Sequence, residues 1–414
     1  MLETSCPTAN EFKGQRVIRR VATLMMNTNS KRSAIVLSAL VVLWLLFTII
    51  FNLEIVTSSW DQLGDFGSFI ASGLFLKDGK NPYSTTSPLI FEVFFPRVNA
   101  GGKMPNLNPP ISLLAFEWIS TGDPIVTVNI WRLLSLLLYV ASFLLLANEY
   151  KPSPLRTLWA FALAGLWHTI GLGQIYTLLL LLTTLAWLSS RRNQFVATGI
   201  FIGLLVSIKP NFILWVLLLA SQKNWKSVLG ASLAIIICAA IPLARMSPEV
   251  YSQWLEAAQV DSHVLMMPGN SSLLGLTSRM GIPQVGAILG LLFLGITFLA
   301  VYRSRDITPN PEALNSTGVF LSLLISPISW VGYTILTLPY FLSQRRWGYS
   351  TLIAAAILTL PFNFTMYFYY QFGKLNFIFW GWWYGIALTI CFCYTLFRIW
   401  RGTGQTKMLE IPQS

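Results

Sequence analysis

Repeated apolar runs, each close to the roughly 20 residues that cross a bilayer as a helix, are the strongest constraint on this chain. Backbone polar groups inside hydrocarbon must be satisfied within the protein, and a helix does this within a single segment. Only 11% of the 414 residues are charged and the mean hydropathy is +0.61, whereas a soluble domain has about 25% charged residues. We therefore expect an all-α, polytopic integral membrane protein.

The net charge of +12 would suggest a nucleic-acid partner in a soluble chain, but here the basic residues lie in short connections between apolar runs. Cytoplasmic loops are rich in Lys and Arg, so membrane topology explains this charge without nucleic acid. If every basic cluster is cytoplasmic, an even number of spans must separate successive clusters. The clusters are Lys151/Arg156, Arg191/Arg192, Lys223/Lys226, Arg303/Arg305, Arg345/Arg346 and Arg398/Arg401.

An arrangement of about twelve spans, within a range of about 10–13, meets this condition and keeps both termini in the cytoplasm. The segment 109–121 opens with two prolines and is too short to cross, so we expect an interfacial helix there. The predicted spans are 33–53, 124–147, 157–172, 174–190, 194–208, 210–221, 226–245, 283–302, 312–326, 328–343, 348–362 and 376–397.

The first apolar run, 33–53, follows a basic segment and lacks a small-residue cleavage signal, so we expect it to remain as a signal anchor. The membrane is expected to be a bacterial inner membrane. The predicted parts of the chain are a cytoplasmic tail (1–32), one transmembrane domain (33–398) with long outer loops (54–123 and 246–282), and a second cytoplasmic tail (399–414).

Several predicted spans are shorter than a bilayer and meet in hairpins at "GLGQ" (171–174), "IKPN" (208–211) and "SPISW" (326–330). Backbone exposed by such breaks is tolerated at membrane depth where it lines a cavity. All three hairpins fall on the same side as the loop 54–123. The sequence thus predicts one cavity that faces outward and is open to both water and lipid.

The cysteines and histidines form no C-x-x-C spacing and no cluster, and no group of carboxylates indicates a metal. We therefore expect no structural disulfide, no zinc site, and neither a metal nor another cofactor. The residues concerned are Cys6, Cys238, Cys391, Cys393, His168 and His263.

The first outer loop contains the stretch "GDFGSFIASGLFLKDGKNPY" at 64–83, with Asp65 and, just before the stretch, Asp61. Apolar residues recur at helical spacing after Asp65, which predicts an interfacial helix over 66–76, followed by a turn at Asn81–Tyr83. Asp65 fits the N-cap of this helix, and a capping aspartate can also be a catalytic carboxylate.

Lys209 places an ammonium in an apolar stretch, "LLVSIKPNFILW", directly before a proline. Ionisable groups at membrane depth are costly and mark functional sites by default. The side chain can either snorkel to the outer interface or bind an anion such as phosphate as a point charge. Neutral hydrogen-bonding residues lie near the same face, at Asn108, Gln174 and 270–272, and each of them taken singly is more often structural than functional.

Six pieces occur in order from about residue 35 to 345: "DF…G.NPY", "NPP.SLL", "GLGQIYTLLLL", "GIFIGLLVSIKP", "NSSLLGL" and "SPISW". Each piece alone is weak. In this order and spacing the chain resembles glycosyltransferase family 87, the polyprenyl-phosphate-dependent, mannosyltransferase-like group of the GT-C fold.

The resemblance implies transfer of a mannose-like sugar, or another hexose or pentose, from a polyprenyl phosphate to a hydroxyl of a lipid or glycan acceptor at the outer face. The family's outer-loop aspartate corresponds to Asp65 as general base, with Asp61 as the nearest competitor. The "KP" lysine corresponds to Lys209, which would hold the donor phosphate, helped by Arg279 or Arg132; a single displacement would invert the anomeric centre. The expected cavity residues are Asn81, Tyr83, Asn108, Gln174, Asn270, Ser272, Ser329 and Trp330.

The chain departs from the family pattern after "SPISW", where it has Gly332 and Tyr333 in place of an aromatic or acidic residue and histidines, and "NPP" replaces "YPP". The missing histidine puts a second acid/base group in doubt and leaves an inactive accessory subunit as an alternative.

Broken helices around one cavity also occur in transporters and flippases, although the chain shows no internal repeat. A polysaccharide ligase or polymerase would use similar donors, with its long outer loop later in the chain.

Overall fold

The computed structural model of the chain divides by its internal contacts into two units, Met1–Phe47 and Thr48–Ser414, and each is considered by itself. In the first unit the described residues are the beginning of a helix, Ile35–Glu54, that is long and apolar enough to cross a membrane. The residues that the structure describes are 35–54, 56–57, 65–84, 106–120, 123–259, 262–304, 310–371 and 379–409.

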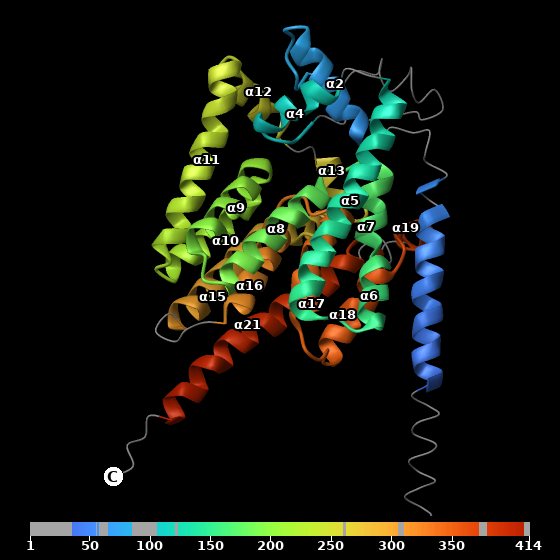
Figure 1. Cartoon of the computed structure of the whole chain (residues 1–414), viewed down its shortest axis with the longest axis vertical. Helices are drawn as coiled ribbons and strands as arrows, with labels where there is room; N and C mark the ends of the chain where they lie inside the picture. The colour runs from blue at the N-terminus through green and yellow to red at the C-terminus, as the bar shows by residue number, and fades with distance from the viewer. Residues whose placement is uncertain are drawn as a thin grey trace, which may run out of the picture. The chain divides into compact units, whose positions relative to one another are not determined.

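Every regular element in these described ranges is a helix, which confirms the all-α prediction (Figure 1). The elements of the second unit are α2 (Phe66–Lys77), α4 (Ile111–Ile119), α5 (Pro124–Tyr150), α6 (Pro154–Phe161), α7 (Ala164–Leu172), α8 (Tyr176–Arg191), α9 (Phe195–Ile208), η1 (Pro210–Phe212), α10 (Ile213–Ser221), α11 (Trp225–Arg245), α12 (Glu249–Ala257), α13 (Ser262–Met266), α14 (Leu273–Arg279), α15 (Pro283–Arg303), α16 (Pro311–Ile325), η2 (Val331–Thr337), α17 (Leu338–Ser343), α18 (Tyr349–Thr359), α19 (Phe362–Gln371) and α21 (Trp383–Leu409).

Five helices in the described part of the chain have the length and composition of a membrane span, and a sixth span results if α18 and α19, bent by 81°, are counted together. The other predicted spans are helices too short to cross alone. For example, the 14 residues of α9 rise about 21 Å, less than the roughly 30 Å of a hydrocarbon core. The prediction of about twelve spans is therefore not confirmed. The five long helices are Ile35–Glu54, Pro124–Tyr150, Trp225–Arg245, Pro283–Arg303 and Trp383–Arg401.

Helix α2 differs from the interfacial helix expected over 66–76. Its first eight residues are all buried, because α4 covers it closely. A Cβ added to Gly73 would lie 2.3 Å from the backbone oxygen of Phe116, and the rings of Phe69 and Phe116 stack at 4.5 Å. The helix predicted over 66–76 is thus present, with its apolar residues packed against α4, and its place at the membrane interface stays a prediction.

The short helix α9 is held against the long helix α11 by glycine contacts. A Cβ on Gly199 would lie 1.9 Å from the oxygen of Ser227, and one on Gly203 would lie 2.4 Å from the oxygen of Ala231. Such close backbone approach is possible only without a side chain. A full-length helix thus braces the short one that ends beside Lys209.

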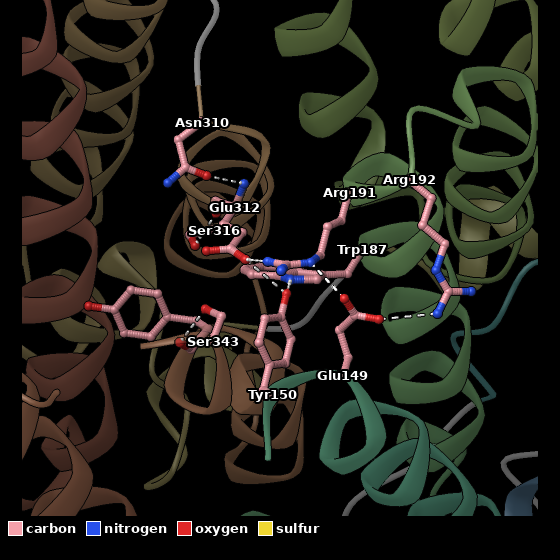
Figure 2. A network of polar contacts seen from close by, with 10 residues as sticks. Glu149, Tyr150, Trp187, Arg191, Arg192, Asn310, Glu312, Ser316 and Ser343 are labelled. Atoms are coloured by element: carbon pink, nitrogen blue, oxygen red, sulfur yellow. Dashed lines mark hydrogen bonds and ion pairs between the residues drawn. The ribbon is translucent and has the colours of Figure 1, made fainter. Parts of the chain in front are cut away.

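A polar network joins the ends of α5, α8 and α16 (Figure 2). The Arg191 guanidinium bonds Glu149 at 2.8 Å and also pairs with Glu312. The Tyr150 hydroxyl donates to Glu312 at 3.0 Å and accepts from the indole N–H of Trp187 at 2.8 Å. This network lies at the end of α5 opposite to α2 and α4 (Figure 1), and it fixes how these three helices are spaced there.

Candidate active site

A cavity of about 450 Å³ in the second unit brings the predicted hairpins together. Gln174 comes from the turn between α7 and α8, Lys209 from the break between α9 and η1, and Trp330 from the segment between α16 and η2. Asp65 at the start of α2 and Asn108 before α4 also line it. Five of the predicted site residues, far apart in sequence, therefore share one cavity.

The Asp65 carboxylate does not cap its own helix. Asp65 occupies the N-cap position of α2, but its side chain makes no capping hydrogen bond. Its Oδ2 instead accepts a hydrogen bond from the amide Nε2 of Gln174 at 2.5 Å. The N-cap interpretation of this side chain is therefore wrong, and the carboxylate belongs to the cavity.

The "GLGQ" turn positions Gln174 through a left-handed glycine. Gly173 ends α7 with φ +68, a conformation that side chains other than glycine rarely adopt. The same residue touches the start of α2, since an added Cβ would lie 2.7 Å from Cβ of Phe66. The backbone N–H of Gln174 then closes the turn onto the Thr169 carbonyl at 2.9 Å. The turn thus sets Gln174 directly beside Asp65.

Lys209 reaches the cavity because α9 ends there. Its backbone is extended (φ −139, ψ 95), as expected for a residue before proline, and Pro210 lacks the N–H that would continue the helix. The ammonium lies 5.9 Å from the ring centroid of Tyr333. Lys209 therefore lines the cavity.

Burial and opposite charge act against each other at these two ionisable groups. Burial raises the pKa of the Asp65 carboxyl above its usual 3.8, while the Gln174 hydrogen bond and the Lys209 charge oppose the rise. Burial lowers the pKa of the Lys209 ammonium from 10.5 to about 8, and the Asp65 charge opposes this fall. The Lys209–Asp65 attraction thus favours the charged form of both groups.

Two tyrosines pack together beside this pair, and one of them, Tyr176, lines the cavity. The rings of Tyr176, on α8, and Tyr333, on η2, lie 4.2 Å apart. Gly332 makes room for them, because a Cβ there would lie 2.3 Å from a ring carbon of Tyr176. Gly332 and Tyr333, where the chain departs from the family pattern, therefore allow two aromatic rings to pack beside Lys209.

The motifs "NSSLLGL" and "SPISW" are joined through Asn270. Its Oδ1 accepts from the backbone N–H groups of Ser272 at 3.2 Å and Ser329 at 3.0 Å, and its amide donates to the Pro327 carbonyl at 3.1 Å. The Ser272 hydroxyl donates to the same carbonyl. Asn270, Ser272 and Ser329 do not line the cavity; they hold the segment that carries Trp330.

The two predicted helper arginines donate to backbone carbonyls. Arg132 bonds the carbonyls of Ile170 at 3.3 Å and Gly171 at 2.9 Å. Arg279 bonds those of Met267 at 3.0 Å and Asn270 at 2.9 Å. Neither side chain is among the residues that line the cavity, so both arginines fix chain segments that form its wall.

Two further predicted residues, Asn81 and Tyr83, lie in the turn that follows α2. The Tyr83 hydroxyl donates to the Asn108 carbonyl at 2.8 Å, and the Tyr83 backbone N–H bonds Oδ1 of Asn81 at 2.9 Å. This forms the turn expected after α2 and supports Asn108 from behind. Asp61 lies outside the described residues.

The prediction missed several cavity residues, of which His168 is the most informative. His168 and Leu172 are four residues apart on α7 and both line the cavity, as residues on one helical face do. A histidine within an apolar run was a usable signal. Phe362 and Met366 line the cavity from α19, most of which lies between the predicted spans 348–362 and 376–397. Apolar lining residues of this kind carry no polar signal in the sequence.

The cavity combines one carboxylate, one ammonium and an extensive apolar wall. A carboxylate can accept a proton from a hydroxyl group, an ammonium can hold an anion, and the apolar wall suits a hydrocarbon chain. Among the described residues, no three His, Cys, Asp or Glu side chains gather as a set of metal ligands. The site is thus equipped to handle an amphiphilic anion and a hydroxyl group.

Comparison with known families identifies the class of protein. The model of glycosyltransferase family 87 matches residues 106–327, more than half of the chain. The chain belongs to glycosyltransferase family 87 and is a membrane glycosyltransferase. No curated protein and no solved structure matches it. The matched region includes Asn108, Gln174 and Lys209, while Asp65 precedes it.

Proposed function

We propose that this glycosyltransferase moves a mannose-like sugar, or another hexose or pentose, from a polyprenyl phosphate to a hydroxyl of a lipid or glycan acceptor. The observation that carries this proposal is the shared cavity of Asp65 and Lys209, with apolar walls around the two charges. The lysine matches a lipid phosphate, the walls match an isoprenoid chain, and the aspartate matches an acceptor hydroxyl.

The proposed reaction is a single displacement. Asp65 takes the proton of the acceptor hydroxyl, and the acceptor oxygen bonds to the anomeric carbon of the sugar. The bond between that carbon and the phosphate oxygen breaks, and its electron pair leaves with the polyprenyl phosphate. Lys209 offsets the charge that develops on the departing phosphate. The anomeric configuration is inverted, and no metal takes part in the proposed steps.

We propose that the cavity lies at the outer face of a bacterial inner membrane, in a protein with about twelve spans of GT-C type and both termini in the cytoplasm. Basic side chains at the other end of α5 support this orientation, since basic residues favour the cytoplasmic side. Arg156 donates to the Arg345 carbonyl at 2.8 Å, and Arg191 and Arg192 pair with Glu149. Basic clusters from several connections thus gather away from the cavity.

A label-transfer assay tests the function directly. Membranes containing the protein are incubated with undecaprenyl-phosphate mannose, glucose or arabinose that carries a label on the sugar. We expect label to move from one of these donors into a lipid or glycan fraction. Movement of the intact donor across the bilayer without transfer would instead indicate a flippase, and no transfer from any donor would contradict the proposal.

The pH dependence of transfer follows from the two ionisable groups. The active form has Asp65 ionised and Lys209 protonated, facing Gln174 and Tyr176 from neighbouring elements. The rate should rise as pH passes the raised pKa of Asp65 and fall above pH about 8, as Lys209 loses its proton. Lys209→Arg keeps its charge at high pH and should remove the alkaline fall. A wild-type rate that stays flat to pH 10 would contradict this assignment.

A further inference from the structure

Two polar atoms of the cavity residues remain unpaired. Nδ1 of His168 and Oδ1 of Asn108 are buried, and neither has a hydrogen-bond partner among the described residues. Both residues line the cavity, from α7 and from the segment before α4. A buried polar atom without a partner is unfavourable, so these two residues are suited to a ligand that supplies hydrogen bonds.

Both side chains are held in place by their surroundings. The His168 ring packs edge-on against Phe362, with ring centroids 4.9 Å apart at 83°. The Asn108 amide donates to Oδ1 of Asn106 at 2.8 Å, and its carbonyl accepts from Tyr83. The terminal torsions of histidine and asparagine are broad, so a rotation about these torsions would present the unpaired atoms to a ligand without moving the backbone.

Three other polar residues of the cavity already interact with neighbouring side chains. Asp65 is bonded to Gln174, Lys209 interacts with Asp65, and Tyr176 packs against Tyr333. In the proposed reaction Lys209 takes the phosphate and Asp65 takes the acceptor hydroxyl. The transferred sugar brings several further hydroxyls, and each of them loses water on entering the cavity and needs a new partner.

We propose that His168 and Asn108 form the subsite that binds the hydroxyls of the donor sugar. An uncharged imidazole and an amide each offer a donor and an acceptor, which matches a hydroxyl better than a phosphate. This inference rests on the proposed function, because it assigns the sugar part of the polyprenyl-phosphate donor. It makes these residues determinants of which sugar is used.

The test compares the sugar-loaded donor with the same lipid phosphate without sugar. His168→Phe keeps an aromatic ring and removes the ring nitrogens. It should raise KM for the donor used by the wild type about tenfold, the effect of losing about 1.4 kcal/mol. Inhibition by undecaprenyl phosphate should not change, because this probe has no sugar. Lys209→Ala should weaken the binding of the donor and of undecaprenyl phosphate, since each of them carries the phosphate.

The outcomes separate the subsite from the overall function. If His168→Phe weakens the binding of the donor and of undecaprenyl phosphate equally, or changes the binding of neither, the subsite is wrong even though the wild type transfers sugar. If the wild type transfers from no donor, the function and the subsite are both wrong. His168→Gln should recover part of the lost affinity for donor. Asn108→Leu, which keeps the backbone bond to Tyr83, provides the same comparison should His168→Phe fail to fold.

Discussion

Replacing Asp65 by asparagine is expected to reduce sugar transfer by about 10²–10⁴-fold, the usual contribution of a general base. The asparagine oxygen can still accept the hydrogen bond of Gln174, so the cavity should keep its shape. The loss should appear in the rate of transfer, with little change in the binding of undecaprenyl phosphate. Initial rates with labelled donor, measured beside phosphate binding, check both parts.

Asp78 offers a matched control at the other end of the same helix. Its side chain is exposed and pairs with Lys80 at 3.0 Å, and such surface pairs contribute little. Asp78→Asn should therefore transfer sugar at the wild-type rate. Full activity of Asp65→Asn would remove Asp65 from the proposed reaction and turn attention to Asp61.

Replacing Lys209 by alanine is expected to weaken the binding of undecaprenyl phosphate by about 10- to 100-fold. The reason is that a hydrogen bond to a charged group contributes about 1.5–3 kcal/mol. Asp65 also loses its nearest opposite charge, so its pKa should rise further and transfer near neutral pH should fall more than binding does. Titration of purified protein with undecaprenyl phosphate measures the first effect, and the rate measures the second.

Lys80→Ala removes an exposed lysine just after α2 and should leave both the binding of undecaprenyl phosphate and the transfer rate unchanged. If Lys209→Ala binds undecaprenyl phosphate as tightly as the wild type, the lysine acts only on the ionisation of Asp65. The donor phosphate would then need another partner. Lys209→Arg is a useful comparison with Lys209→Ala, since a bulkier cation can restore the charge without restoring the fit of a compact ammonium.

The sequence predicted most helices because their signals are local. The predicted spans 124–147 and 226–245 correspond to α5 and α11, whose apolar runs begin and end at polar or basic residues. α19 was not predicted as a separate helix, because its first residue falls in the predicted span 348–362 and the residues after it are mixed aromatic and polar. The spacing of apolar residues predicted α2, but spacing along one helix does not reveal that α4 covers it.

The candidate site was predictable only as separate pieces. Asp65 and Gln174 are 109 positions apart, and no local pattern states that the aspartate bonds this amide and leaves its own helix uncapped. Arg132 and Arg279 were reasonable phosphate ligands by charge, yet both donate to backbone carbonyls. Which hydrogen-bond partner a charged side chain meets depends on tertiary packing, and that information is spread over the whole chain.

The bonds of Arg132 have an electrostatic consequence for the cavity. Helix α7 ends beside it, and the last carbonyls of a helix carry the negative end of the helix dipole, equivalent to about half an elementary charge. Left bare, the carbonyls of Ile170 and Gly171 would repel an anion brought to Lys209. The guanidinium covers both of them. Arg132 thus makes this end of the cavity more favourable to a negatively charged lipid without touching it.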